Sequence, residues 1–481
     1  MAERDLCFTS ATELVRMYRA GKASPLEVMQ TILAQIDRVN PKVNAIVTLA
    51  RESALADARA ATRALSRRAE LPPLFGVPVV IKDLTVTKGI RTTYGSKIYA
   101  DHVPTEDALV VQRLKAAGAI VLGKTNTPEF GAGANTFNAV FGATRNPWNL
   151  ALTCGGSSGG SAVALATGMG PIAHGTDLGG SLRIPAAFCG VVGFRTTPGL
   201  IPVYPRELAW DHFSVHGPMA RTVADAALML SVMAGPDDRS PISYPVDTRE
   251  FVKAIRRPSV RGWRIAWTPD LSGLIPVDTE VAAVAAQGAR VFRSIGARVE
   301  TASPDFAETN DIVLSTRGLM MATLHAEKLL QWRDQMQKNL VWNIEQGLRL
   351  TPHDIGRGEK LRTTLWHRVR IFFERYDLLV LPTVAVKPFP VEQPHPAEIN
   401  GHQLANYTQW FFLTYAISLT GLPAISVPCG FTRDGLPVGL QIVGRRRQES
   451  AVLTAAAAFE RAAPWADRVP PTVGQATAPR S

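Results

Sequence analysis

Two glycine- and serine-rich turns contain the residues of this chain that are best suited to nucleophilic chemistry. The first turn spans residues 155–160 (GGSSGG), and the second spans residues 177–181 (DLGGS). Glycine permits positive φ values and a close approach of the backbone to either serine hydroxyl. Successive N–H groups of the second turn can point at one spot and form an anion-binding nest. The turns predict a nucleophile, a second hydroxyl and an oxyanion hole that converge.

The stretch between the two turns argues against a flexible glycine–serine linker. Residues 161–168 (SAVALATG) are small and apolar and predict a buried helix, and the chain continues after the second turn into SLRIPAAFCGVVGF. A linker would not enclose an apolar helix.

Lys82 lies within a short apolar run, VPVVIKDL (residues 77–84), which predicts an interior strand. A lone lysine in such a run is usually a structural residue whose amine reaches solvent or a partner. Burial, however, disfavours the ammonium form and lowers the pKa of a lysine, so that a neutral amine can act as a base. Because two serine turns accompany Lys82, we favour the base.

The segment from 155 to 186 resembles the motif of the amidase signature family, serine hydrolases with a Ser–Ser–Lys triad. The matching residues are Gly155, Gly156, Ser157, Ser158, Gly159, Gly160, Asp177, Gly179, Ser181, Arg183 and Pro185. Segments 77–84, 123–131, 146–149, 217–230 and 419–431 are also similar to the family. The resemblance covers most of the chain and is weakest from about 240 to 370.

The resemblance implies a role for each residue of the triad. Lys82 would be the base, Ser157 the bridging hydroxyl and Ser181 the nucleophile. The resemblance also implies a cis peptide between Gly156 and Ser157. The main-chain N–H groups expected to form the oxyanion hole are those of Leu178, Gly179, Gly180 and Ser181.

Other residues are expected to bind the substrate or to support the site. Gly131 and Ser157 are the expected substrate contacts. The residues expected to hold the turns in place are Gly156, Thr176, Asp177 and Arg183. Arg183 also has an alternative role, the recognition of an acidic substrate.

The implied reaction is amide hydrolysis through a covalent acyl-enzyme, giving a carboxylate and an amine or ammonia. Segments 199–217 and 406–417 are rich in aromatic residues. If these segments line the pocket, the substrates are small apolar or aryl amides, with esters, anilides and carbamates as further candidates.

Two alternatives remain open. An amidotransferase subunit that acts in a transfer-RNA-dependent complex would share the triad, but it usually has glutamine where this chain has Ile184. Residues 156–160 also fit G-x-S-x-G, which would make Ser158 the nucleophile of a Ser-His-Asp hydrolase. The preceding residues 150–154 predict a poor strand, and no histidine stands out among His325, His353, His367, His395 and His402.

Helix-to-strand alternation predicts an α/β fold, a three-layer α/β/α single domain around a large, mostly parallel mixed sheet, with an N-terminal helical region. Capping boxes at Ser10 and Ser24 predict two of its first helices. Within the single domain 1–481 we expect N-terminal helices (1–70), the catalytic core (71–235), a variable helical substrate-side region (236–370) and the C-terminal part of the sheet (371–481).

The composition is that of a globular enzyme, with 46% hydrophobic and 19% charged residues among 481. The net charge is +11, but the arginines are scattered, so we expect no nucleic-acid partner. The four cysteines show no CxxC, and no metal-ligand motif is present, so we expect neither metal nor cofactor. The chain has no secretory signal or apolar membrane span, which predicts a cytoplasmic protein that does not bind membranes. The expected partner is a small-molecule amide, with a homodimer as one open alternative for the assembly.

Overall fold

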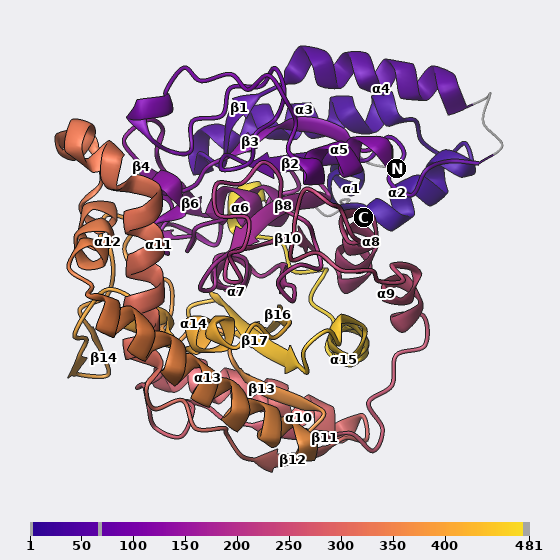
Figure 1. Cartoon of the computed structure of the whole chain (residues 1–481). Helices are drawn as coiled ribbons and strands as arrows, with labels where there is room; N and C mark the ends of the chain where they lie inside the picture. The colour runs from indigo at the N-terminus through magenta and orange to yellow at the C-terminus, as the bar shows by residue number, and fades with distance from the viewer. Residues whose placement is uncertain (1–2, 66–69, 475–481) are drawn as a thin grey trace.

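A large mixed sheet runs through the centre of the computed structural model, which describes residues 3–65 and 70–474 (Figure 1). In the described part this sheet has eleven strands in the order β1-β3-β2-β8-β10-β9-β16-β17-β13-β11-β12. In chain order they are β1 (Ile46–Leu49), β2 (Pro78–Lys82), β3 (Ile120–Thr125), β8 (Ile172–Asp177), β9 (Val192–Arg195), β10 (Val215–Ala220), β11 (Arg264–Trp267), β12 (Arg298–Thr301), β13 (Leu378–Pro382), β16 (Ala424–Phe431) and β17 (Pro437–Gly444).

The expected α/β class with one large mixed sheet is confirmed. Parallel pairs form two groups, β3-β2-β8 and β13-β11-β12. Antiparallel pairs connect these groups through β10, β9, β16 and β17, and attach β1 at one edge. The sheet was expected to be mostly parallel, and its parallel strand pairs lie within these two groups.

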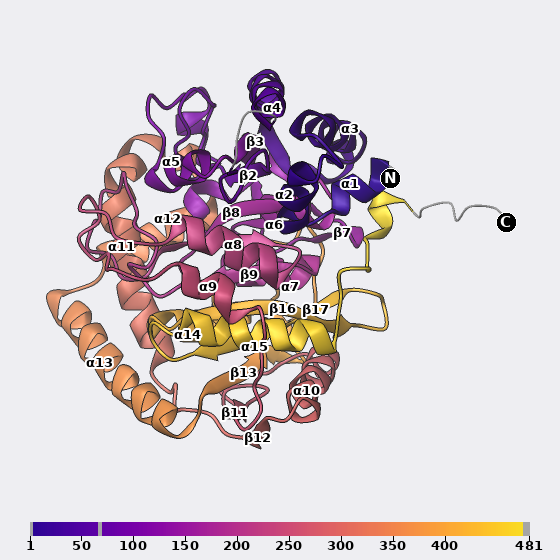
Figure 2. The ribbon, with the colours of Figure 1, turned by 90° about the vertical axis from the view of Figure 1, so that its right-hand side faces the viewer.

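Helices cover both faces of the sheet, as Figures 1 and 2 show. The bounds are α1 (Glu3–Phe8), α2 (Ala11–Arg19), α3 (Pro25–Val43), α4 (Arg51–Leu65), α5 (Leu109–Ala116), α6 (Gly159–Ala166), α7 (Arg183–Cys189), α8 (Val223–Met233), α9 (Arg249–Ala254), α10 (Thr279–Ser294), α11 (Thr309–Trp332), α12 (Lys338–Leu348), α13 (Pro352–Arg375), α14 (Phe412–Leu419) and α15 (Glu449–Ala462). On one face, α5, α8, α10 and α15 share a hydrophobic core with the sheet. On the other face, α3 and α6 share a second core, and α13 and α14 a third.

Alternating strand residues enter opposite cores, which fixes the position of Lys82. In β2, Val79 and Ile81 pack into the core of α5 and α8, whereas Val80 packs against α6. All five residues of β2 are buried, as its apolar sequence predicts. Lys82 therefore emerges at the end of an interior strand, among other buried groups.

Local sequence signals explain several element boundaries. Ser24 and Glu27 form the predicted capping box of α3, with Pro25 in its first turn. Ser10 caps α2 by accepting a hydrogen bond from the N–H of Glu13. The predicted helix between the two turns is α6, and all of its residues are buried. Residues 150–154 were expected to form a poor strand, and most of them belong to β7 (Asn149–Thr153), which pairs with β6 (Arg145–Asn146) in a two-stranded ribbon outside the main sheet.

Asp225 of α8 ties the start of α2 to α8, and its removal is expected to destabilise the fold. Its buried carboxylate accepts hydrogen bonds from the N–H groups of Ala11 and Thr12 and from the Thr12 hydroxyl. Asp225→Ala should lower the free energy of unfolding by about 2–4 kcal/mol, because buried donors lose their acceptor. Urea unfolding measures this change. Asp57→Ala, on an exposed position of α4, is the control, and equal stability of the two variants would contradict the argument.

Candidate active site

The end of β2 brings Lys82 to the first glycine–serine turn. Nζ of Lys82 lies 2.7 Å from Oγ of Ser157, 3.0 Å from Oγ of Ser158 and 2.9 Å from Oγ1 of Thr176. The lysine side chain is fully buried. Burial lowers its pKa well below the ordinary value, and the more distant charge of Asp177 opposes this only in part. The arrangement favours a neutral amine hydrogen-bonded to hydroxyl groups.

The peptide bond between Gly156 and Ser157 is cis, as the resemblance implied. The turn is also closely packed around its glycines. A Cβ atom at Gly156 would lie 3.0 Å from Oγ1 of Thr136, and one at Gly159 would lie 2.3 Å from the same atom. The N–H of Ser158 donates to the carbonyl of Ser181 at 3.1 Å, which joins the two glycine–serine turns directly.

Asp177 organises the second turn through a fully buried carboxylate. It accepts hydrogen bonds from the N–H groups of Gly180 (2.8 Å) and Leu182 (3.1 Å), and it forms ion pairs with Arg183 (3.0 Å) and Arg195 (3.2 Å). Burial alone would raise the pKa of Asp177, but the two guanidinium groups outweigh this effect and hold the pKa well below its usual range. The turn therefore closes on an ionised carboxylate.

The hydrogen bond from Gly180 changes the expected oxyanion hole. Its N–H was counted among four donors, but it points at Asp177 and not at the cavity. In the described part of the chain, the N–H groups of Leu178, Gly179 and Ser181 have no protein acceptor. These three groups remain available to stabilise a developing negative charge.

A cavity of about 410 Å³ opens above these groups. Ser157, Thr176, Leu178 and Ser181 line it, so both expected serines border the same space. Gly131 also lines it, with φ near +70°, and a Cβ there would approach within 3.4 Å of Oγ of Ser157. The expected substrate-contact residues are therefore at the cavity surface.

One wall of this cavity is aromatic, and its residues lie outside the two aromatic segments expected at the pocket. The ring of Tyr94 packs edge-to-face on Tyr99 and stacks on Phe130, whose ring lies 4.6 Å from that of His325. All four residues line the cavity. Phe130 directly precedes Gly131 and has a positive φ of 47°, which is unusual for a bulky residue and re-aims the chain at this wall.

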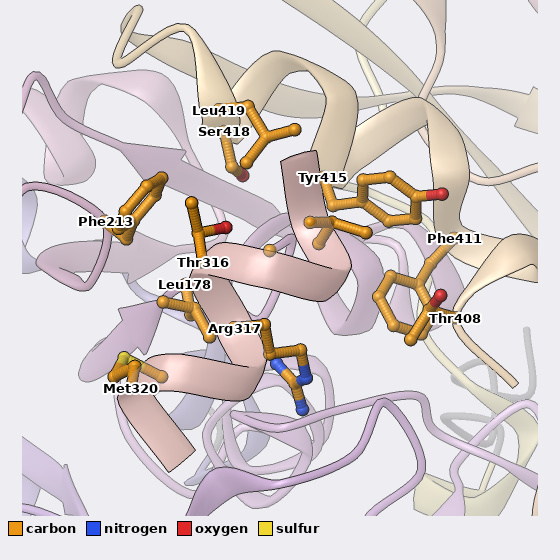
Figure 3. A pocket seen from close by; sticks show the side chains of 12 residues that line it. Leu178, Phe213, Thr316, Arg317, Met320, Thr408, Phe411, Tyr415, Ser418 and Leu419 are labelled. Carbon is orange, nitrogen blue, oxygen red and sulfur yellow. The ribbon is translucent and has the colours of Figure 1, made fainter. Parts of the chain in front are cut away.

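The two aromatic segments expected at the pocket have different positions. Part of 199–217 lines the main cavity, through residues that include Val203, Tyr204, Leu208, Ser214 and His216. By contrast, Thr408, Phe411 and Tyr415 line a smaller apolar pocket (Figure 3). Leu178 and Met320 border both spaces, so the second segment lies one side chain away from the main cavity.

Several residues that hold the site were missed because they are distant in sequence. Arg195 is the second cation on Asp177, and Gln441 and Ser418 accept hydrogen bonds from Arg183. The long helix α11 contributes Met320, Met321, Leu324 and His325 to the cavity. Lys124, a second buried lysine, lies beside Asp83. It was also missed, because nothing in the sequence of its strand sets it apart.

The alternative roles considered for single residues lack support from the geometry. The Ser158 hydroxyl lies against Lys82 and the carbonyl of Thr176, not against a histidine, and Ser158 is fully buried. Arg183 is fully buried against Asp177 and does not line the cavity. Burial raises the pKa of the Cys154 thiol to about 12, so this cysteine is not a thiolate.

Two further properties hold for residues 3–65 and 70–474. No helix there is long and apolar enough to cross a membrane. No group of three or more His, Cys, Asp or Glu side chains in this part could hold a metal ion.

Comparison with known proteins gives consistent matches over nearly the whole chain. The chain is 42% identical to an acylamidase of Rhodococcus erythropolis over 474 residues, covering 98% of each protein. It is 35% identical to a glutamyl-tRNA(Gln) amidotransferase subunit of Geobacillus kaustophilus, covering 96% of this chain and 98% of the relative.

Solved structures agree with these sequence matches. A bacterial aryl acylamidase of the amidase signature family superposes with a TM-score of 0.91 at 32% identity, covering 98% of this chain and 99% of the other. A 6-aminohexanoate cyclic dimer hydrolase superposes with a TM-score of 0.88 at 30% identity, covering 97% and 99%. Residues 27–453 match the model of the family described as Amidase, and the chain therefore belongs to the Amidase family.

Proposed function

We propose that this chain hydrolyses small amides through an acyl-enzyme on Ser181, with Ser157 as the proton relay and Lys82 as the base. The observation that carries the proposal is the 2.7 Å contact between Nζ of the buried Lys82 and Oγ of Ser157, at the edge of a cavity that Ser181 shares. A neutral amine beside a hydroxyl can accept a proton through it.

The reaction follows from these positions. Lys82 accepts a proton from Ser157 as Ser157 takes the proton of Ser181, and Oγ of Ser181 attacks the amide carbon. The N–H groups of Leu178, Gly179 and Ser181 stabilise the oxyanion. When the C–N bond breaks, Ser157 returns a proton to the departing amine and recovers one from Lys82. Water then attacks the acyl carbon by the same relay, and Ser181 leaves with its proton restored.

The aromatic wall supports aryl amides as the substrate class. Tyr94, Tyr99, Phe130 and His325 present ring faces and edges to the cavity, which suit a flat aromatic group. The relatives described as an acylamidase and an aryl acylamidase support the same choice. Anilides are the simplest members of this class, and aryl esters and carbamates offer the same reacting carbonyl.

A stand-alone hydrolase fits the second turn better than an amidotransferase subunit does. Ile184, which replaces the glutamine usual in those subunits, is buried against both turns, at the positions of Gly155 and Gly180.

We propose the division at residues 70, 235 and 370 within one domain, with 236–370 as the substrate-side region. The contribution of α11 to the cavity supports that assignment.

The nucleophile can be tested by covalent labelling. Ser181→Ala should lower kcat by at least about a thousandfold, because no acyl-enzyme can form. A sulfonyl fluoride should label the wild type on the peptide that contains Ser181, as read by mass spectrometry. In Ser158→Ala the label on Ser181 should persist, because this variant removes a hydroxyl that contacts Lys82 but leaves the nucleophile in place. Undiminished labelling and turnover in Ser181→Ala would refute the assignment.

The substrate class can be tested at the aromatic wall. Phe130→Ala should raise KM for an anilide by about tenfold and change hydrolysis of a short aliphatic amide much less, because ring contacts contribute roughly 0.5–1.5 kcal/mol beyond area burial. Steady-state kinetics on the matched pair of substrates measures the difference. Phe431→Ala is the control, since its ring packs on Trp148 away from the cavity. Equal losses on both substrates would argue against an aryl site.

The pH dependence should report a lysine base. Burial lowers the pKa of Lys82, and only the unprotonated amine accepts a proton, so kcat/KM should rise with pH through that lowered pKa. In Lys82→Ala this rising limb and most of the rate should disappear. The matched variant is Lys124→Met, because burial also lowers the pKa of Lys124, to about 7. If the rising limb survives in Lys82→Ala but vanishes in Lys124→Met, Lys124 is the titrating group and the assignment of Lys82 as the base is wrong.

A further inference from the structure

A pair of buried histidines adjoins the catalytic groups and has no part in the relay described above. Nε2 of His174 on β8 lies 2.7 Å from Nδ1 of His216 on β10. His174 is fully buried, and His216 is 9% exposed. His216 lines the main cavity and lies opposite Thr176 in the antiparallel register. Because Oγ1 of Thr176 lies 2.9 Å from Nζ of Lys82, the pair is next to the base.

The surroundings fix both rings in the neutral form. Burial lowers the pKa of His174 well below its ordinary value and that of His216 to about 3. Arg206 also lowers the pKa of His216, and Lys124 that of His174. A neutral imidazole carries one N–H donor and one acceptor nitrogen.

The hydrogen-bond partners of the ring nitrogens decide which nitrogen of each histidine carries the proton. Nδ1 of His174 is buried without a hydrogen-bond partner among the described residues. A proton there would be a buried donor with no acceptor, which is the costlier arrangement. The proton of His174 is therefore assigned to Nε2, which donates to Nδ1 of His216. The proton of His216 is then on its Nε2. This nitrogen has no protein partner among the described residues, and His216 lines the cavity.

We propose that the N–H at Nε2 of His216, held in that tautomer by His174, orients the water molecule that hydrolyses the acyl-enzyme. This inference rests on the acyl-enzyme mechanism of the proposed function. The water must give its proton to Ser157, so it occupies the place that the departing amine has left, on the side of Lys82 and Thr176. One lone pair of the water accepts the hydrogen bond from His216, and the other attacks the acyl carbon. Ser157 and Lys82 take up the proton, and the C–O bond to Ser181 breaks.

Competition between two nucleophiles tests the proposal. The probe is 4-nitroacetanilide with added hydroxylamine, which captures the acyl group as a hydroxamate, whereas water gives acetate. Single-turnover release of nitroaniline measures acylation separately in each variant, whereas the ratio compares only the two fates of the acyl-enzyme. In His216→Phe, loss of one orienting hydrogen bond should raise the hydroxamate-to-acetate ratio by about three- to tenfold. His216→Gln, which keeps a neutral N–H donor, should restore the ratio.

Two further variants separate water positioning from a structural role. His174→Phe leaves the cavity surface intact but frees the tautomer of His216, so it should raise the ratio by a smaller factor. His325→Leu, on the aromatic wall, should change KM for the anilide and leave the ratio as in wild type. The ratio is set by one acyl-enzyme intermediate, so it remains measurable even if part of a variant sample is unfolded.

The outcomes discriminate clearly. An unchanged ratio in His216→Phe overturns the inference, as does a loss confined to KM, which would make His216 a contact for the substrate. If wild-type enzyme itself forms no hydroxamate and no acyl-enzyme, the proposed function fails first, and the inference fails with it.

Discussion

The burial of Lys82 without a contacting carboxylate is the constraint on which the rest of the site depends. A buried ammonium group is costly unless it is paired, and here the neighbours of Nζ are three hydroxyl groups. The cost is reduced when the amine is neutral, and a neutral amine is the form that can act as a base. Interior strands on both sides, β3 and β8, keep this lysine away from water. The fold thus sets the chemistry by excluding solvent.

The second turn shows the opposite solution, in which a buried charge is fully paired. Asp177 bonds with two guanidinium groups and two backbone N–H groups. Removing Asp177 would leave two guanidinium groups uncompensated in the interior, and breaking a buried ion pair in this way typically costs about 3–5 kcal/mol. The same carboxylate accepts the hydrogen bond from the N–H of Gly180. The N–H groups of Leu178, Gly179 and Ser181 are therefore the ones left for an oxyanion. The nest and the ion pairs are therefore a single unit.

Short-range patterns were enough to predict the strand that ends at Lys82 and the buried helix between the two turns, whereas the triad roles rest on the resemblance. The apolar runs around Lys82 and at 120–125, 264–267, 378–382 and 424–431 are strands, since interior strands need few signals beyond continuous apolar sequence. The glycine turns were recognisable because few other residues tolerate such backbones. Gln441 was not, because it meets Arg183 from a distant part of the sequence, and Arg195 and His216 belong to no motif that marks them as partners. The N–H of Gly180 was misassigned since a nest pattern does not reveal its acceptor.

Besides Ile184 at the second turn, the cavity wall is a place where this chain can differ from relatives with other activities. Acylamidase and amidotransferase relatives both match over nearly its whole length, so neither overall fold nor family separates them. The wall is assembled from the loop at Phe130, the segment from 203 to 216 and helix α11, which the sheet brings together from distant parts of the sequence. None of these segments carries the buried amine of Lys82 or the buried carboxylate of Asp177. Their side chains can therefore differ between relatives without disturbing the base or the nest, and substrate choice can change while the chemistry stays the same.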